Sequence, residues 1–134
     1  MTTGRSIDDL LEEARRHIRR LCPSATVEAI RDGALLIDLR LLEYRLRFGE
    51  VPGAIPVSRH VLEWRLDPRS PDRLPVIEDH DQPIVLMCTE GYTSSLAAHS
   101  LQQLGLTRVM DLEGGFVAWQ DAGLPWLSHG AEPE

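Results

Sequence analysis

The spacing of apolar residues predicts a helix near the start of the chain. Apolar side chains recur every three or four positions over residues 7–21, and Ser6, with an acidic residue three positions later, forms a weak capping-box pattern before them. Pro23 is expected to end this helix, because proline cannot continue the helical hydrogen-bond pattern. A short strand over residues 26–30 and a turn at Asp32-Gly33 are predicted to follow.

Three compact apolar runs further along the chain predict buried strands, over residues 34–39, 84–87 and 108–112. Segments with helical periodicity predict two helices, over residues 94–104 and 116–122. Prolines interrupt the pattern elsewhere, which predicts a short helix over residues 61–66 and a long surface connection over 67–82. Strands that alternate with helices are typical of an α/β fold. We therefore predict an open, mostly parallel sheet with helices on both faces and an extra N-terminal helix.

Composition and charge restrict the possible functions. The chain has 134 residues, of which 43% are hydrophobic and 26% charged, and this suits one globular domain. Its formal net charge is −7, so we expect no binding to nucleic acids or to anionic membrane surfaces. The apolar runs are too short to span a bilayer, and the first residues do not resemble a signal peptide, which together predict a cytoplasmic location.

The two cysteines, Cys22 and Cys88, are too few for a disulfide framework and do not form a Cys-x-x-Cys pair. Both are expected to be free thiols in a reducing compartment, and Cys22 is expected to be structural or incidental. The spacing of histidines and cysteines indicates no metal site, and no cofactor is predicted. The oligomeric state is left open.

The loop after the strand over residues 84–87 is the strongest candidate for chemistry. It contains, in order, Cys88, Thr89, Glu90, Gly91, Tyr92, Thr93 and Ser94, and a predicted helix follows. Ligands of open parallel sheets bind at the carboxyl ends of the strands, and the N-terminus of a following helix offers unpaired N–H groups. Gly91 can adopt the positive φ that lets the backbone curl around the sulfur. The sequence therefore predicts a nucleophilic cysteine in a backbone cradle.

Four segments in chain order resemble motifs of the rhodanese family. They are Asp38-Leu39-Arg40 with Glu43-Tyr44; residues 49–56, which read Gly-Glu-Val-Pro-Gly-Ala-Ile-Pro; Ile84 to Cys88; and Gly114-Gly115-Phe116-x-Ala118-Trp119 with Gly123-Leu124-Pro125. Glu50 stands where histidine is usual in the second motif. On this resemblance we divide the chain into an N-terminal helical extension with a short strand (1–32), a rhodanese-like domain (33–126) and a C-terminal tail (127–134).

The resemblance implies sulfur transfer. Members of the family carry a sulfane sulfur as a persulfide on the loop cysteine and pass it to a thiophilic acceptor. By this resemblance Cys88 would be the nucleophile, residues 89–94 would form its substrate-binding cradle, and Asp38 and Arg40 would support the loop. The partners would be a sulfur donor and a thiol or protein acceptor of unknown identity.

The loop also departs from the family. Members that use thiosulfate commonly have arginine directly after the cysteine and again five positions after it, where this chain has Thr89 and Thr93. Each lost charge-assisted hydrogen bond to an anion is worth about 1.5–3 kcal/mol, so poor use of thiosulfate is expected. The altered loop leaves a non-catalytic binding or regulatory module as an alternative. A phosphatase or arsenate reductase is set aside, because that chemistry needs a loop arginine and the chain has none between Arg73 and Arg108.

Overall fold

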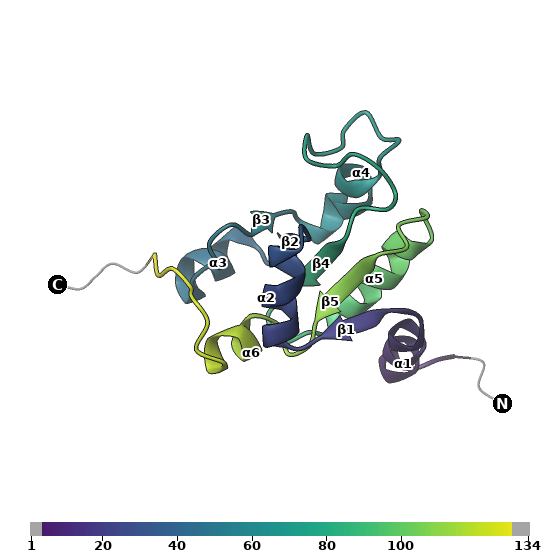
Figure 1. The fold of residues 1–134 in the computed structure, drawn as a ribbon. Coiled ribbons are helices and arrows are strands. Elements are labelled where there is room, and N and C mark those ends of the chain that lie inside the picture. Colours follow the sequence, from purple (N-terminus) through teal and green to yellow (C-terminus); the bar gives the residue numbers. More distant parts are fainter. Residues whose placement is uncertain (1–3, 130–134) are drawn as a thin grey trace.

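The computed structural model describes residues 4–129 and contains a five-stranded sheet with the strand order β1-β5-β4-β2-β3 (Figure 1). The strands are β1 (Arg19–Leu21), β2 (Leu35–Asp38), β3 (Ile55–Pro56), β4 (Ile84–Met87) and β5 (Val109–Leu112), and each neighbouring pair is parallel. The helices are α1 (Ile7–His17), α2 (Pro23–Arg31), α3 (Leu42–Phe48), α4 (Leu62–Leu66), α5 (Thr93–Gln102) and α6 (Gly115–Asp121), with a 3₁₀ turn over Arg59–Val61 before α4. The predicted parallel α/β architecture is confirmed.

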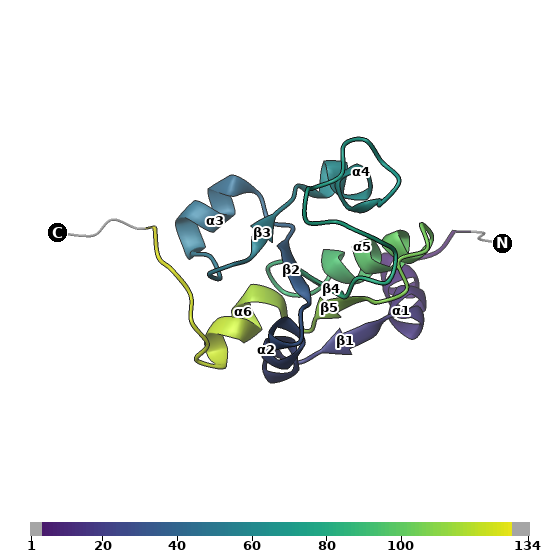
Figure 2. The same ribbon diagram turned by 45° about the horizontal axis from the view of Figure 1, so that its top comes forward.

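Two hydrophobic cores lie on opposite faces of this sheet. Strand β4 is fully buried, and its alternate residues divide between the two cores, as the two-residue period of a strand requires. Ile84 and Leu86 pack with residues of α4 and α5, whereas Val85 and Met87 pack with residues of α2 and α6. Figure 2 shows α2 and α6 together on one side, away from α4 and α5. Burial on both faces explains the continuous apolar run of β4.

The N-terminal segment differs from the prediction. The predicted strand over residues 26–30 is wrong, because these residues belong to helix α2. Pro23 occupies the first turn of that helix, where its missing N–H costs nothing and its fixed φ favours the helix. The first helix ends at His17 rather than at residue 21, and Arg19–Leu21 form β1 at the edge of the sheet beside β5. The segment therefore completes the sheet instead of only packing on it.

Helix α3 was not predicted, since its residues lack a buried apolar stripe and none of them is buried.

Within residues 4–129 no helix is both long enough and apolar enough to cross a membrane.

Candidate active site

Cys88 lies directly after β4, at the carboxyl end of the parallel strands. Only 6% of its surface is exposed. Its Sγ accepts a hydrogen bond of 3.2 Å from the backbone N–H of Gly91, whose φ of +88° curls the loop back toward the sulfur. This places a thiol where a parallel sheet binds its ligands, with a backbone donor directed at it.

The loop closes one side of a cavity of about 300 Å³. The lining residues are Leu39, Arg40, Leu41, Tyr44, Cys88, Thr89, Glu90, Tyr92 and Thr93. The structure thus brings together most of the predicted loop with the segment that follows β2. Leu41 and Tyr44 were not among the predicted site residues, although Tyr44 belongs to the first family-like motif.

Two of the predicted loop residues, Gly91 and Ser94, are buried and do not line the cavity. Gly91 is buried, and its φ and its hydrogen bond to the sulfur shape the loop rather than the cavity wall. Ser94 is fully buried, and its hydroxyl donates a 2.8 Å hydrogen bond to Asp111 Oδ2. Both residues therefore support the loop from inside the protein.

Asp38 and Arg40 form a buried ion pair beside the cavity. Arg40 donates from Nε at 3.0 Å and from Nη2 at 2.8 Å to the two carboxylate oxygens of Asp38, and Nη2 also donates to the carbonyl of Gly49 at 2.8 Å. The guanidinium lies over the ring of Phe116, 4.0 Å from its centroid. The side chains are 1% and 2% exposed, so the pair holds β2, the end of α3 and the start of α6 in register.

The first turn of α6 donates hydrogen bonds to the carbonyl groups of the loop. The N–H of Phe116 donates to the carbonyl of Cys88 at 2.8 Å, and the N–H of Val117 donates to that of Thr89 at 3.1 Å. These are N–H groups of the first helical turn, which have no partner within the helix. Gly115, at φ +60°, allows the helix to approach so closely.

A sequence model of the rhodanese-like domain family matches residues 23–122. The chain belongs to this family. A sulfurtransferase from Allochromatium vinosum is 31% identical to the chain over 94 residues, which cover 70% of the chain and 78% of that protein. A thiosulfate sulfurtransferase, GlpE, from Actinobacillus pleuropneumoniae is 38% identical over 47 residues, which cover 35% of the chain and 44% of that protein.

One solved structure resembles this rhodanese-like domain over nearly its whole length. It is a Rhodopseudomonas palustris protein of unknown function that is described as a possible tyrosine phosphatase. It is 35% identical to the domain and has a TM-score of 0.84, with 95% of this chain and 98% of that chain covered.

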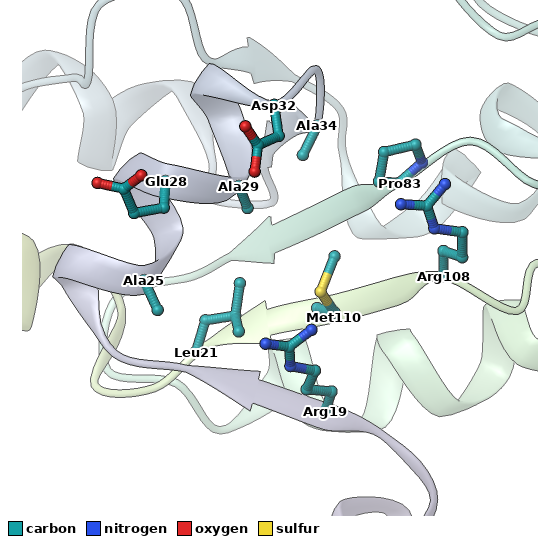
Figure 3. A pocket seen from close by; sticks show the side chains of 10 residues that line it. All are labelled: Arg19, Leu21, Ala25, Glu28, Ala29, Asp32, Ala34, Pro83, Arg108 and Met110. Carbon is teal, nitrogen blue, oxygen red and sulfur yellow. The ribbon is translucent and has the colours of Figure 1, made fainter.

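The rhodanese-like domain has a second cavity, of about 280 Å³, between α2 and the strands β1 and β5 (Figure 3). Its charged lining residues are Arg19, Glu28, Asp32 and Arg108, and neither cysteine is among the residues that line it. Pro83 and Arg108 precede β4 and β5, so this cavity lies at the amino end of the strands, opposite to Cys88. Among residues 4–129, no group of three His, Cys, Asp or Glu side chains could hold a metal ion.

The second thiol, Cys22, is exposed at the start of α2. Its Sγ lies 3.3 Å from Ser24 Oγ, and this hydrogen bond is the main cause that lowers the pKa of Cys22 below its ordinary value. An exposed thiol of lowered pKa reacts readily with alkylating agents. Measurements on Cys88 in this domain therefore need a Cys22→Ser background.

Glu50, which replaces the usual histidine of the second motif, joins α3 to the C-terminal segment. Arg45 Nη1 donates to Glu50 Oε1 at 2.9 Å, and His129 Nε2 contacts Oε2. The hydrogen bond from Arg45 is the main cause that holds the pKa of Glu50 below its ordinary value; burial opposes it, and His129 adds to it. Glu50 and Leu127 also exchange two backbone hydrogen bonds.

We expect Glu50→Gln to lower the free energy of unfolding by roughly 1 kcal/mol at neutral pH. Because the pKa of Glu50 is lowered on folding, its contribution is complete above the ordinary value of 4.5 and is lost as the pH falls through the folded value. The difference in the free energy of unfolding between the two proteins should therefore become smaller as the pH falls below 4.5. Urea unfolding across the acid range measures it, with Glu43→Gln, an exposed position on α3, as a control. An equal difference at every pH would contradict the role of the carboxylate.

Proposed function

We propose that this rhodanese-like domain is a sulfurtransferase that carries a sulfane sulfur as a persulfide on Cys88. The observation that carries the proposal is the position of the Cys88 sulfur, which accepts the N–H of Gly91 and borders a cavity of about 300 Å³ at the carboxyl end of the sheet. Relatives that bear the name sulfurtransferase support this reaction type.

The reaction needs two displacements at sulfur. In the first, the Cys88 thiolate attacks the sulfane sulfur of the donor, and the bond between that sulfur and the rest of the donor breaks, with the electron pair leaving on the donor fragment. In the second, the thiolate of an acceptor attacks the outer sulfur of the persulfide, and the Cys88 thiolate leaves. The acceptor takes up one sulfur atom, and the protein returns to its starting state.

The cavity favours a donor of low charge. Its walls include Leu39, Leu41, Tyr44 and Tyr92. The charge of Arg40 is paired with Asp38, and the loop residues from Cys88 to Ser94 include no arginine or lysine. A dianion such as thiosulfate would enter this site without a free cation of the loop to receive it. We therefore propose a neutral sulfane donor or a protein persulfide as donor and a thiol as acceptor.

A phosphatase reaction receives less support from this loop. Such an enzyme must stabilise a phosphoryl group, usually with a loop arginine. Two arginines from outside the loop, Arg15 and Arg20, donate to the carbonyl of Gly91 and do not line the cavity. Arg40 does line the cavity, but its charge is paired with Asp38. In this orientation Arg15 and Arg20 support the loop and do not donate hydrogen bonds to an anion bound in the cavity beside Cys88.

We expect one additional sulfur atom on the intact Cys22→Ser protein after exposure to a low-molecular-weight persulfide, and its loss on adding a thiol acceptor. The same protein with Cys88→Ser should gain no sulfur, because the attacking atom is missing. Intact mass spectrometry before and after the acceptor measures both steps. Absence of the adduct on a folded protein, across a panel of sulfane donors, would favour the non-catalytic binding or regulatory module.

A further inference from the structure

We propose that Arg15 and Arg20, from α1 and β1, position Cys88 by holding the carbonyl of Gly91. The Nη2 atoms of both arginines donate to this oxygen, each at 2.9 Å. The N–H of the same glycine donates to Cys88 Sγ at 3.2 Å. The two polar groups of Gly91 thus connect the N-terminal segment to the sulfur. The inference rests on the proposed function only in taking Cys88 as the reactive residue.

Both guanidinium groups also make hydrogen bonds that lead to Asp111. Arg20 Nε donates to Asp111 Oδ1 at 3.0 Å, and Arg15 Nε donates to Ser95 Oγ at 3.0 Å. The Ser95 hydroxyl donates in turn to Asp111 Oδ2 at 2.8 Å. Asp111 lies on β5 and is fully buried, so one carboxylate orients both arginines. Glu113, 3.9 Å from Arg20, is exposed and adds little.

Gly91 depends on such support because glycine has more backbone freedom than any other residue. A Cβ at this position would lie 2.8 Å from the backbone nitrogen of Gly114 and 3.1 Å from Arg20 Nη2, so any other residue would force the Gly114 backbone to shift. If the carbonyl is released, Gly91 can rotate, and its N–H spends less time on the sulfur. We infer that α1 and β1 therefore complete the active site from behind.

The first test uses Arg15→Met in the Cys22→Ser background, because methionine keeps much of the apolar stem. We expect hydrogen exchange of the Gly91 amide, followed by NMR, to become about tenfold faster, and sulfur loading of Cys88 to slow by a similar factor. The amides of β4 should keep their protection, which separates local release from general destabilisation. Arg15→Lys should recover part of both effects, since an ammonium can still donate to the carbonyl. Arg16→Met, on the exposed side of the same helix, is the matched control.

The second test removes Arg20. Because this change alone would leave Asp111 buried without its cation, it is combined as Arg20→Met with Asp111→Asn, and the exposed Arg19→Met is the control. The positioning role would be overturned if the Gly91 amide exchanged at an unchanged rate both in folded Arg15→Met and in the folded double variant Arg20→Met with Asp111→Asn. Faster exchange in variants of a protein that never loads sulfur would support the positioning role and contradict the proposed sulfurtransferase.

Discussion

Gly115→Ala is expected to destabilise the protein by about 3–5 kcal/mol and to impair sulfur loading on Cys88. At φ +60° an alanine is strained, and its Cβ would meet the carbonyl oxygens of both Cys88 and Thr89, the latter at 2.6 Å. Either the start of α6 or the loop must move, which breaks the hydrogen bonds from Phe116 and Val117 to the loop. Urea unfolding and intact mass after exposure to a persulfide measure the two effects.

The matched control is Gly123→Ala. Gly123 also has a positive φ, of +75°, but a Cβ there would meet no atom within 4 Å. It should cost about 1 kcal/mol from backbone strain alone and leave sulfur loading intact. Equal losses of stability in the two variants would show that strain, and not the close approach of α6 to the loop, sets the requirement for glycine at position 115.

Thr93→Arg is expected to raise kcat/KM for sulfur transfer from thiosulfate to cyanide by about tenfold to a hundredfold over a poorly active starting protein. Thr93 is exposed and lines the Cys88 cavity, so an arginine there can present two donors to the anion. Glu90→Gln should help less, because Glu90 is exposed and solvent screens its charge. The rates of the single and double variants over a range of ionic strength test both statements.

Thr107→Arg controls for net charge, because Thr107 is exposed at the other end of the sheet, just before β5. It should leave the thiosulfate reaction unchanged. Strong activity of the unaltered protein would contradict the argument from charge. Poor activity that neither loop substitution improves, in folded proteins, would mean that the shape of the cavity selects the donor.

The sequence alone determined the fold class and the place of the candidate loop that contains Cys88. The apolar run of β4, Cys88 and the periodic helix after it are neighbours along the chain, so local patterns predict the strand, the loop and the helix without knowledge of the rest. The same holds for Gly91, whose positive φ follows from the tight turn. Family membership, suggested by four ordered motifs, is confirmed.

Local patterns failed where one residue serves two opposite purposes. Pro23 ends a helix or begins one, and the sequence does not distinguish the two. The structure places it at the start of α2, so residues 26–30 are helical and the short segment before it is free to pair with β5. A three-residue strand is too short to show a period of its own.

Tertiary structure decided what surrounds the loop. Arg15 and Arg20 lie 76 and 71 positions before Gly91 in the chain, and they reach its carbonyl because α1 packs on α5 and β1 pairs with β5. Leu41 and Tyr44 complete the cavity because β2 and β4 are neighbours in the sheet. Side chains that meet across strands leave no local pattern, because their spacing depends on the length of the intervening chain and not on the geometry of one element.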